Sequence, residues 1–196
     1  TPNYNLTGTA QKGPFVTGYN ISINEINGPT LTQTGKSFST QTINGFGDFG
    51  ISELTISSNF VLLKADGYYF NENTAKISEA PLTLYSLADL SKGQEVNVNI
   101  LTHLERARVE FLLKSGSSFT NAKFQAQNEI LKSFGLYKEN ETIQADKLSF
   151  YKSSVNDAKL LAISSILQGY RTVGELSVLL ANLANDLKED GKIDEA

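Results

Sequence analysis

The chain of 196 residues contains no cysteine, no tryptophan and no methionine, and it has a single histidine. The absence of cysteine excludes a disulfide, a thiolate metal site and a cysteine nucleophile. A zinc site normally gathers more than one nitrogen or sulfur ligand, so one histidine argues against zinc as well. The missing tryptophan weakens the case for a glycan platform built on aromatic rings, although tyrosine remains available for one.

Charge and long apolar segments are also scarce. Only 19% of the residues are charged, the net charge is −4 and the pI is near 5.1, whereas a nucleic-acid-binding protein is expected to carry a basic face. No apolar run approaches the ~20 residues needed to cross a bilayer, and no signal peptide is evident. We therefore expect no nucleic-acid partner and no membrane span. Because the chain begins at Thr1 without a methionine, we expect it to be a piece of a longer precursor.

The first half of the chain is dominated by the alternating pattern of β-strands. Its central stretch is Gly45 to Phe70, where Phe49 and Ile51 alternate with polar residues and Phe60 to Leu63 forms a short apolar run. Such a run is typical of a strand that is covered on both faces. We expect a tight turn before the first of these two strands and an Asp66-Gly67 turn inside the second.

About seven short strands with frequent turn signals predict an antiparallel β-sandwich over residues 1–100. The expected strands are Tyr4 to Ala10, Val16 to Ile23, Ser37 to Thr42, Phe49 to Ile56, Phe60 to Ala65, Pro81 to Leu87 and Val96 to Ile100.

The second half, residues 101–196, has helical periodicity and predicts a domain of about four α-helices. Ser118 is an expected N-cap, and Ser154 with Asp157 and Thr172 with Glu175 resemble capping boxes. The stripes predicted to face inward are Leu101, Leu104, Ala107, Phe111 and Leu112; Ala122, Ala126, Ile130 and Phe134; Leu160, Ile163, Ser164 and Leu167; and Leu176, Leu179, Leu180, Leu183 and Leu187. The predicted fold class is therefore α+β, with a domain boundary near residue 100.

Three stretches carry a family resemblance: Gly8 to Tyr19, Thr34 to Ile51 and Phe60 to Glu72. They resemble the carboxypeptidase regulatory-like, transthyretin-like sandwich. The continuation through Val96 to Phe111 and Ala122 to Gly135 is similar to bacterial surface lipoproteins in which this sandwich precedes helices. The resemblance implies the fold, an extracytoplasmic address at the outer membrane or cell surface or in secreted form, and a scaffold or binding role. It carries over no catalytic residues. Because such proteins are anchored through a lipidated cysteine, it places any lipid anchor outside this chain.

The segment Gly45 to Gly50 matches G-x-G-x-x-G and contains Asp48-Phe-Gly50. Dinucleotide binding requires a helix directly after the glycines, and a kinase requires further motifs and a longer chain. Since the pattern after Gly50 is that of a strand, we interpret this segment as a turn followed by a strand.

His103 lies near Glu105, and Glu110 follows seven residues later, so His103 and Glu110 fall on one face of a helix. Spacing alone leaves a Ser-His-Asp arrangement open, but no G-x-S-x-G nucleophile elbow is present. We favour a histidine in the first helical turn that contacts the sandwich.

The segment Asp186 to Asp194 resembles half of a calcium loop, with Asp186, Asp190 and Asp194 at loop positions 1, 5 and 9 and Gly191 at position 6. Lys188 occupies position 3, where an oxygen ligand belongs, and position 12 falls beyond Ala196. The alternative is a helix closed by Gly191 in the left-handed conformation. Calcium is thus the only cofactor for which the sequence offers candidate ligands.

The aromatic residues Tyr68 to Phe70 and Tyr85 form either a ligand platform or, as we favour, cross-strand packing. The polar segment Asn71 to Asn73 ends a strand, and loops at the ends of sandwiches are common binding sites. The candidate binding residues are Tyr68, Tyr69, Asn71 and Glu72.

No convergent catalytic constellation is recognisable, so we expect a non-enzymatic, extracytoplasmic bacterial binding or adhesion module with a surface protein or a glycan as partner. A structural spacer within a longer surface protein is the alternative. A hydrolase that uses His103 is a more remote one.

Overall fold

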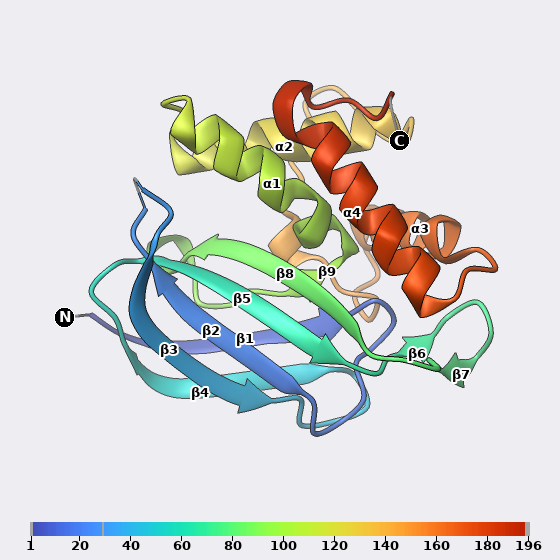
Figure 1. Cartoon of the computed structure of the whole chain (residues 1–196), viewed down its shortest axis with the longest axis horizontal. Helices are drawn as coiled ribbons and strands as arrows, with labels where there is room; N and C mark the ends of the chain where they lie inside the picture. Colours follow the sequence, from blue (N-terminus) through green and yellow to red (C-terminus); the bar gives the residue numbers. More distant parts are fainter. Residues whose placement is uncertain (1, 29, 195–196) are drawn as a thin grey trace.

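The computed structural model describes residues 2–28 and 30–194, and over these residues the chain is α+β (Figure 1). The strands are β1 (Asn3–Gln11), β2 (Asn20–Ile26), β3 (Gln33–Gln41), β4 (Asp48–Thr55), β5 (Phe60–Gly67), β6 (Phe70–Asn71), β7 (Lys76–Ile77), β8 (Leu82–Asp89) and β9 (Val98–Asn99). The α-helices are α1 (Ile100–Lys114), α2 (Phe119–Ser133), α3 (Val155–Gln168) and α4 (Val173–Asp190). Two 3-10 turns, η1 (Leu90–Lys92) and η2 (Ala145–Lys147), complete the described elements.

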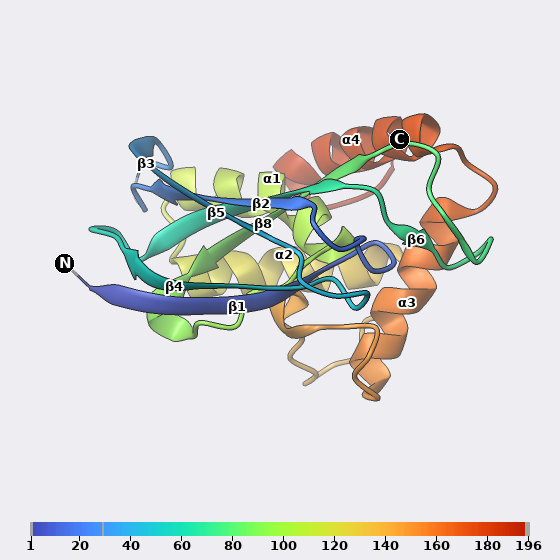
Figure 2. The same ribbon diagram turned by 90° about the horizontal axis from the view of Figure 1, so that it is seen from below.

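Two sheets and a small hairpin make up the first half. One sheet has the order β4-β1-β9, the second has the order β3-β2-β5-β8, and β6 pairs with β7. The two sheets form separate layers in Figure 2. Apolar residues of both sheets, including Leu6 and Leu63, belong to one buried cluster, so the space between the layers is filled by side chains.

Strand β5 shows why the alternating pattern was informative. Val61, Leu63 and Ala65 are buried, and Leu62 on the opposite face packs against a second apolar cluster under α1 and α2. The prediction of a strand covered on both faces is therefore confirmed. The predicted Asp66-Gly67 turn is wrong, because β5 stays paired with β8 as far as Gly67, which lies opposite Leu82.

The end of the β-region also differs from the prediction. The strand expected from Val96 to Ile100 shrinks to two residues, and it pairs with β1 in parallel rather than antiparallel orientation. The cause is the Asn99 side chain, which accepts hydrogen bonds from the backbone N–H groups of Leu101 and Thr102 and so starts α1 at Ile100. The sequence interpretation overlooked this cap.

The helix caps that the sequence predicted are confirmed. Ser118 accepts a hydrogen bond from the N–H of Asn121, and both predicted capping boxes form, at Ser154 and at Thr172. Gly191 ends α4 in the left-handed conformation, with φ 76°. Each cap satisfies backbone groups that the helix itself cannot pair.

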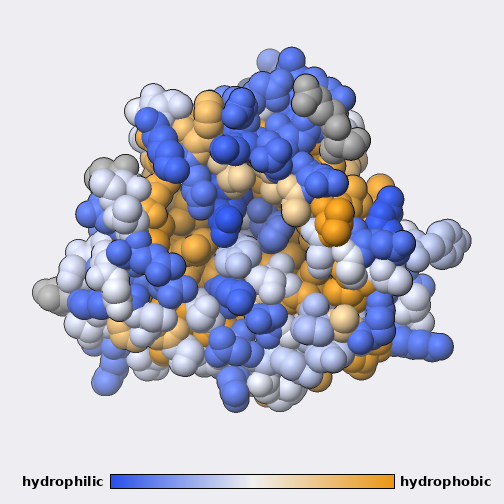
Figure 3. All heavy atoms as spheres, viewed as in Figure 1, coloured by the Kyte–Doolittle hydropathy of each residue, from blue (hydrophilic) through white to orange (hydrophobic). Residues whose placement is uncertain are grey.

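The four helices pack against the β-region rather than standing apart from it. Residues of β8, α1, α3 and α4 share the largest buried cluster. A smaller cluster joins the outer face of the β3-β2-β5-β8 sheet to α1 and α2 through residues that include Leu87 and Val109. Figure 3 shows the remaining outer surface of this sheet as mostly hydrophilic, with hydrophobic atoms exposed along its border with the helices. Within the described residues, no helix is long and apolar enough for a membrane span.

Candidate functional site

The β6–β7 hairpin is held in a fixed shape by its own asparagine. The Asn71 Oδ1 accepts hydrogen bonds from the backbone N–H groups of Asn73 (2.9 Å) and Thr74 (3.2 Å). Ala75, the last residue before β7, has φ 55°, and its N–H donates to the Asn71 carbonyl oxygen. An asparagine that pairs with the backbone two residues ahead is a common turn former, so the hairpin keeps its shape through local bonds.

The hairpin is also fastened to the turn between α3 and α4. Asn73 Nδ2 donates to the carbonyl oxygens of Ser165 (3.0 Å) and Gly169 (3.2 Å), which lie at the C-terminal end of α3. Gln168 forms a second link: its Oε1 accepts from the Tyr69 hydroxyl at 2.8 Å, and its Nε2 donates to the Arg171 carbonyl oxygen at 2.7 Å. The two segments, about a hundred residues apart in sequence, therefore lie side by side at one end of the molecule (Figure 2).

A buried ion pair lies beneath this contact. The Nζ of Lys12, whose side chain is 0% exposed, is 2.5 Å from Glu72 Oε1, and the other Glu72 oxygen accepts from the Gly13 N–H at 3.2 Å. Ser164 of α3 places its hydroxyl 2.8 Å from Glu72 Oε1. Burial lowers the pKa of Lys12 and outweighs the attraction of Glu72. Burial also raises the pKa of Tyr69, and the nearby Glu72 adds to this rise.

Between the hairpin and the α3–α4 turn lies an open groove of about 870 Å³. Its lining includes Asn73, Lys76, Ile77, Glu79, Tyr170 and Arg171. Ile77 is 54% exposed and Tyr170 is completely exposed, while Glu79 is fixed by accepting a hydrogen bond from the Val173 N–H at 2.8 Å. The groove thus combines an apolar side chain, a free aromatic ring and charges of both signs.

The predicted binding residues occupy different places around this groove. Asn71 lines it, and Glu72 lies below it in the ion pair with Lys12. Tyr69 is completely buried and stacks on Phe15 with ring centroids 6.3 Å apart, so in this structure its ring has no surface to offer a ligand. Tyr68 packs against Tyr19 at 5.6 Å.

Sequence reasoning missed the groove residues of the α3–α4 turn and of β7, among them Tyr170, Arg171 and Ile77. One signal was available: Gly169 to Arg171 is a short segment between a helix end and the Thr172 capping box, and an aromatic residue in such a turn has little to pack against. Nothing in the sequence, however, indicates that this turn faces the hairpin.

His103 lies in the first turn of α1 and contacts β8, as favoured from the sequence. The imidazole ring packs against the Tyr85 ring, with the two ring centroids 5.8 Å apart. The guanidinium of Arg106 lies over the same tyrosine ring, 4.4 Å from its centroid. Burial, helped by Arg106, lowers the pKa of His103 to about 4, so the imidazole is neutral near pH 7. Among the described residues, its Nδ1 has no hydrogen-bond partner.

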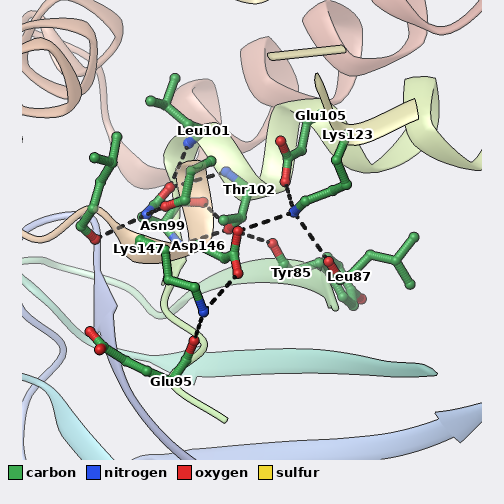
Figure 4. A network of polar contacts seen from close by, with 12 residues as sticks. Tyr85, Leu87, Glu95, Asn99, Leu101, Thr102, Glu105, Lys123, Asp146 and Lys147 are labelled. Atoms are coloured by element: carbon green, nitrogen blue, oxygen red, sulfur yellow. Dashed lines mark hydrogen bonds and ion pairs between the residues drawn. The ribbon is translucent and has the colours of Figure 1, made fainter. Parts of the chain in front are cut away.

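A second buried ionic cluster joins α1, α2 and η2 (Figure 4). Lys123 Nζ forms an ion pair with Glu105, lies 3.6 Å from Asp146 Oδ1 and donates to the Leu87 carbonyl oxygen at 3.2 Å. Burial raises the pKa of Glu105 to about 7 despite the lysine. Burial acts to lower the pKa of Lys123, but the carboxylates of Glu105 and Asp146 outweigh it and raise that pKa. Burial acts to raise the pKa of Asp146, but Lys123 and Lys147 outweigh it and lower that pKa. Strongly shifted carboxylates also occur in active sites, but here every charge is paired across a helix contact, so the cluster joins these elements.

The candidate calcium ligands do not form a metal site. Asp186 and Asp190 lie on α4, and the carboxylate of Asp186 accepts a hydrogen bond from the Asp194 N–H at 3.0 Å. Asp190 accepts from the Lys192 N–H at 3.0 Å. Within the part of the chain that the structure describes, no three acidic or histidine side chains converge as metal ligands. Helix α4 continues through loop positions 1 to 5, which in a calcium loop bend around the ion, so the half-loop interpretation is corrected in favour of a capped helix.

The Gly45 to Gly50 segment is a turn, as predicted. Asn44 Oδ1 accepts from the Phe46 N–H at 2.9 Å, Gly47 has φ 78°, and β4 begins at Asp48. A strand rather than a helix follows the glycines, so the geometry required for a pyrophosphate site is absent.

Comparisons with known proteins return no relative. No family model matches the chain, and neither the search of curated proteins nor the search of solved structures finds a match.

Proposed function

We propose that this protein is a non-enzymatic binding module whose ligand docks in the groove between the β6–β7 hairpin and the α3–α4 turn. In this proposal the two sheets form a transthyretin-like sandwich, which serves as the scaffold for the site, and the protein acts at a bacterial cell surface. The proposed cell-surface location and the proposed family rest on the sequence resemblance alone. The groove supplies the physical argument for binding.

The observation that carries the proposal is the completely exposed ring of Tyr170 beside a groove with a fixed frame. An exposed tyrosine in a turn gains little by burial within its own chain, but it offers a flat apolar face and a hydroxyl to a ligand at low entropic cost. The frame around it is held by Asn73, Gln168 and Glu79. A preorganised site avoids the cost of ordering loops on binding.

The composition of the groove favours a surface glycan or an extended peptide. Tyr170 and Ile77 provide apolar contact, while Lys76, Arg171 and Glu79 provide polar partners of both signs. A purely apolar ligand would leave these charges without water or partners. A ligand that carries both donors and acceptors can meet Lys76, Arg171 and the fixed Glu79 together.

The test is a thermal-shift screen of cell-wall glycan fragments and short peptides, followed by calorimetry on any hit. A ligand of the groove should raise the melting temperature of the wild-type protein and should lose its effect on Tyr170→Ala. The matched control is Tyr137→Ala, which removes a partly exposed tyrosine outside the groove and should bind normally. A hit that binds Tyr170→Ala as tightly as wild type would rule out the groove.

Localisation can be tested separately. Fractionation of cells that express the full-length protein, with an antibody against this segment, should find it in the envelope or in the medium. Recovery in the cytoplasm alone would contradict the proposed address but would leave the groove argument unaffected.

A further inference from the structure

Two hydrogen bonds join the walls of the groove, one on either side of its middle residues. On one side Asn73 Nδ2 donates to the Gly169 carbonyl oxygen at 3.2 Å. On the other side Glu79 accepts from the Val173 N–H at 2.8 Å. The hairpin residues that line the groove at positions 74–77 lie between these two contacts. A chain that ran the length of the groove would have to pass under one of these bonds, so we expect a ligand to enter with a chain end.

Two cations of the groove have no carboxylate partner. Lys76 lines the groove from β7, and no ion pair reaches it within the described residues. Arg171 lines the groove from the α3–α4 turn, and its guanidinium donates to the Leu167 carbonyl oxygen at 3.2 Å. A guanidinium has five N–H donors, so most of those of Arg171 remain available. Both side chains are exposed, and the two walls therefore present two cations to whatever enters.

Two acidic residues that could neutralise these cations cap helix α4 instead. Glu79 accepts from the N–H of Val173, the first residue of α4. Glu175 Oε2 accepts from the N–H of Thr172 at 2.8 Å and from its hydroxyl at 2.9 Å. The bonds from Thr172 lower the pKa of Glu175, and the nearby Arg171 adds to this without forming an ion pair. Because capping keeps both carboxylates at the start of α4, an anionic group of a ligand can take the place beside the two cations.

We propose that the groove binds the C-terminus of a partner polypeptide, with the terminal carboxylate held between Lys76 and Arg171. This inference rests on the proposed function and names its ligand. A C-terminus carries a carboxylate for the two cations, a backbone N–H for Glu79 and a last side chain for Ile77 and Tyr170. The planar fork of Arg171 suits two parallel bonds to a carboxylate. Capture of a C-terminal carboxylate is a recurring mode of peptide recognition.

The apolar residues of the groove favour a peptide over an acidic sugar. Ile77 is 54% exposed and Tyr170 is completely exposed, so covering both with an apolar side chain removes apolar surface from water, at about 25 cal/mol per Å². A sugar carries hydroxyl groups around its ring and would leave the branched side chain of Ile77 facing polar groups. We therefore expect the bound C-terminus to end in an apolar residue such as leucine or phenylalanine.

The experiment compares one peptide in two chemical forms. The probe is a library of fluorescent hexapeptides that end in leucine or phenylalanine, and the tightest binder is then made again as its C-terminal amide. By fluorescence polarisation, wild type should bind the free acid about tenfold or more tightly than the amide, because the amide loses the charge-assisted hydrogen bonds. The preference should shrink as the salt concentration rises, since exposed ion pairs are screened.

Lys76→Gln is the first variant, because this lysine has no ion-pair partner to lose within the described residues. It should weaken binding of the acid about tenfold and leave binding of the amide unchanged. The matched control is Lys138→Gln, which removes an exposed lysine outside the groove and should keep the full preference. Arg171→Gln should behave as Lys76→Gln does. Arg171→Lys should recover only part of the preference, since it restores the charge but not the fork.

The outcomes separate this inference from the proposed function. An amide that binds as tightly as the acid would overturn the inference, as would an acid preference that survives both Lys76→Gln and Arg171→Gln. In either case binding that is lost in Tyr170→Ala would still support the groove as a ligand site. Tyr170-dependent binding of a glycan fragment, with no peptide bound, would likewise reject the C-terminus and keep the groove. Peptide binding that Tyr170→Ala leaves unchanged would reject both.

Discussion

Two lysines, Lys12 and Lys123, form ion pairs where the helices meet other parts of the fold, and their pKa values shift in opposite directions. Lys12 lies under the groove and has one carboxylate partner, Glu72, and its pKa is lowered. Lys123 lies between α1, α2 and η2 with two carboxylate partners, Glu105 and Asp146, and its pKa is raised.

The comparison shows that the number of partners decides whether desolvation or pairing dominates. For Lys12, whose side chain is 0% exposed, one carboxylate does not offset the loss of water. For Lys123 a second carboxylate reverses the balance, although burial also opposes the charged form there. At the second site burial raises the pKa of Glu105 to about 7 even though Lys123 lowers it.

The largest effect is expected from removing the lysine that has two partners. Lys123→Met leaves the buried Glu105 without a cation and Asp146 with Lys147 alone, so we expect the free energy of unfolding to fall by about 3 kcal/mol or more. Lys12→Met leaves a single carboxylate that still has Gly13 N–H and Ser164 as partners, so its cost should be smaller, about 1 kcal/mol.

Urea unfolding of both variants at pH 7 measures this difference. Lys132→Met, which removes an exposed lysine from the same helix as Lys123, serves as the control and should change stability by less than about 0.5 kcal/mol. Equal losses for Lys123→Met and Lys12→Met would contradict the role assigned to the second carboxylate.

The next largest effect is a pH dependence of the free energy of unfolding, which originates at Glu105. Its pKa is about 7 in the folded protein and 4.5 in the reference state, so between these values the folded state binds more protons than the unfolded state. The free energy of unfolding should therefore fall as pH rises from about 4.5 to 7. At about 1.4 kcal/mol per pKa unit the fall amounts to at most roughly 3 kcal/mol.

Glu105→Gln should remove this slope, because the amide does not titrate. The measurement is the free energy of unfolding of wild type and variant at several pH values between 4.5 and 7. The lowered pKa of Asp146 contributes stability that is lost only as pH falls below about 3.8, outside this window. A wild-type curve that rises across the window, or a variant with the same slope as wild type, would show that Glu105 does not carry the effect.

At the other site, Glu72→Gln should destabilise the protein by about 2 kcal/mol at pH 7, because Lys12 would keep its charge without a carboxylate partner. Since the pKa of Lys12 is already lowered, the unfolded state binds more protons than the folded state at pH values up to 10.5. Stability should therefore rise with pH on the alkaline side, and the deficit of the variant should shrink as Lys12 deprotonates. Unfolding curves at pH 7 and pH 9 test this; a deficit that grows with pH would refute it.

The smallest effect should come from the hydroxyl that links α3 to this ion pair. Ser164 Oγ lies within hydrogen-bond reach of the Lys12 carbonyl oxygen and of Glu72 Oε1. Ser164→Ala should cost about 1 kcal/mol, as expected for one buried hydrogen bond. Ser165→Ala, at a half-buried position on the same helix, should cost less than half as much, and thermal unfolding of the two variants compares them directly.

Local features were predictable because their causes are local. The capping boxes at Ser154 and Thr172 and the left-handed Gly191 depend on residues three or four positions apart. The α+β class and the order of strands before helices followed from the change of hydrophobic period. The Asn99 cap was equally local, and was overlooked because Ile100 extends the apolar pattern of the residues before it.

The functional surfaces were not predictable in the same way. Asn71 was predicted to lie at the end of a strand and is the last residue of β6, but the sequence does not indicate that Tyr170 lies across a groove from this hairpin. Tyr69 is a residue type that often forms aromatic platforms for ligands. Only its contacts with Phe15 and Gln168 show that it lies inside the protein. Likewise, the two groove cations are far apart in the sequence, and only the packing brings them into one groove.

The sequence by itself determined the α+β class, the order of strands before helices and the capped starts of α2, α3 and α4, because hydrophobic period and caps act over a few positions. It also determined which chemistry is excluded, since a chain without cysteine and with one histidine cannot build thiolate or polyhistidine sites. The tertiary structure alone decided which lysine meets one carboxylate and which meets two, and which apolar residues stay in solvent. Those outcomes depend on segments up to about a hundred and fifty residues apart, whose meeting is fixed by the packing of the whole chain.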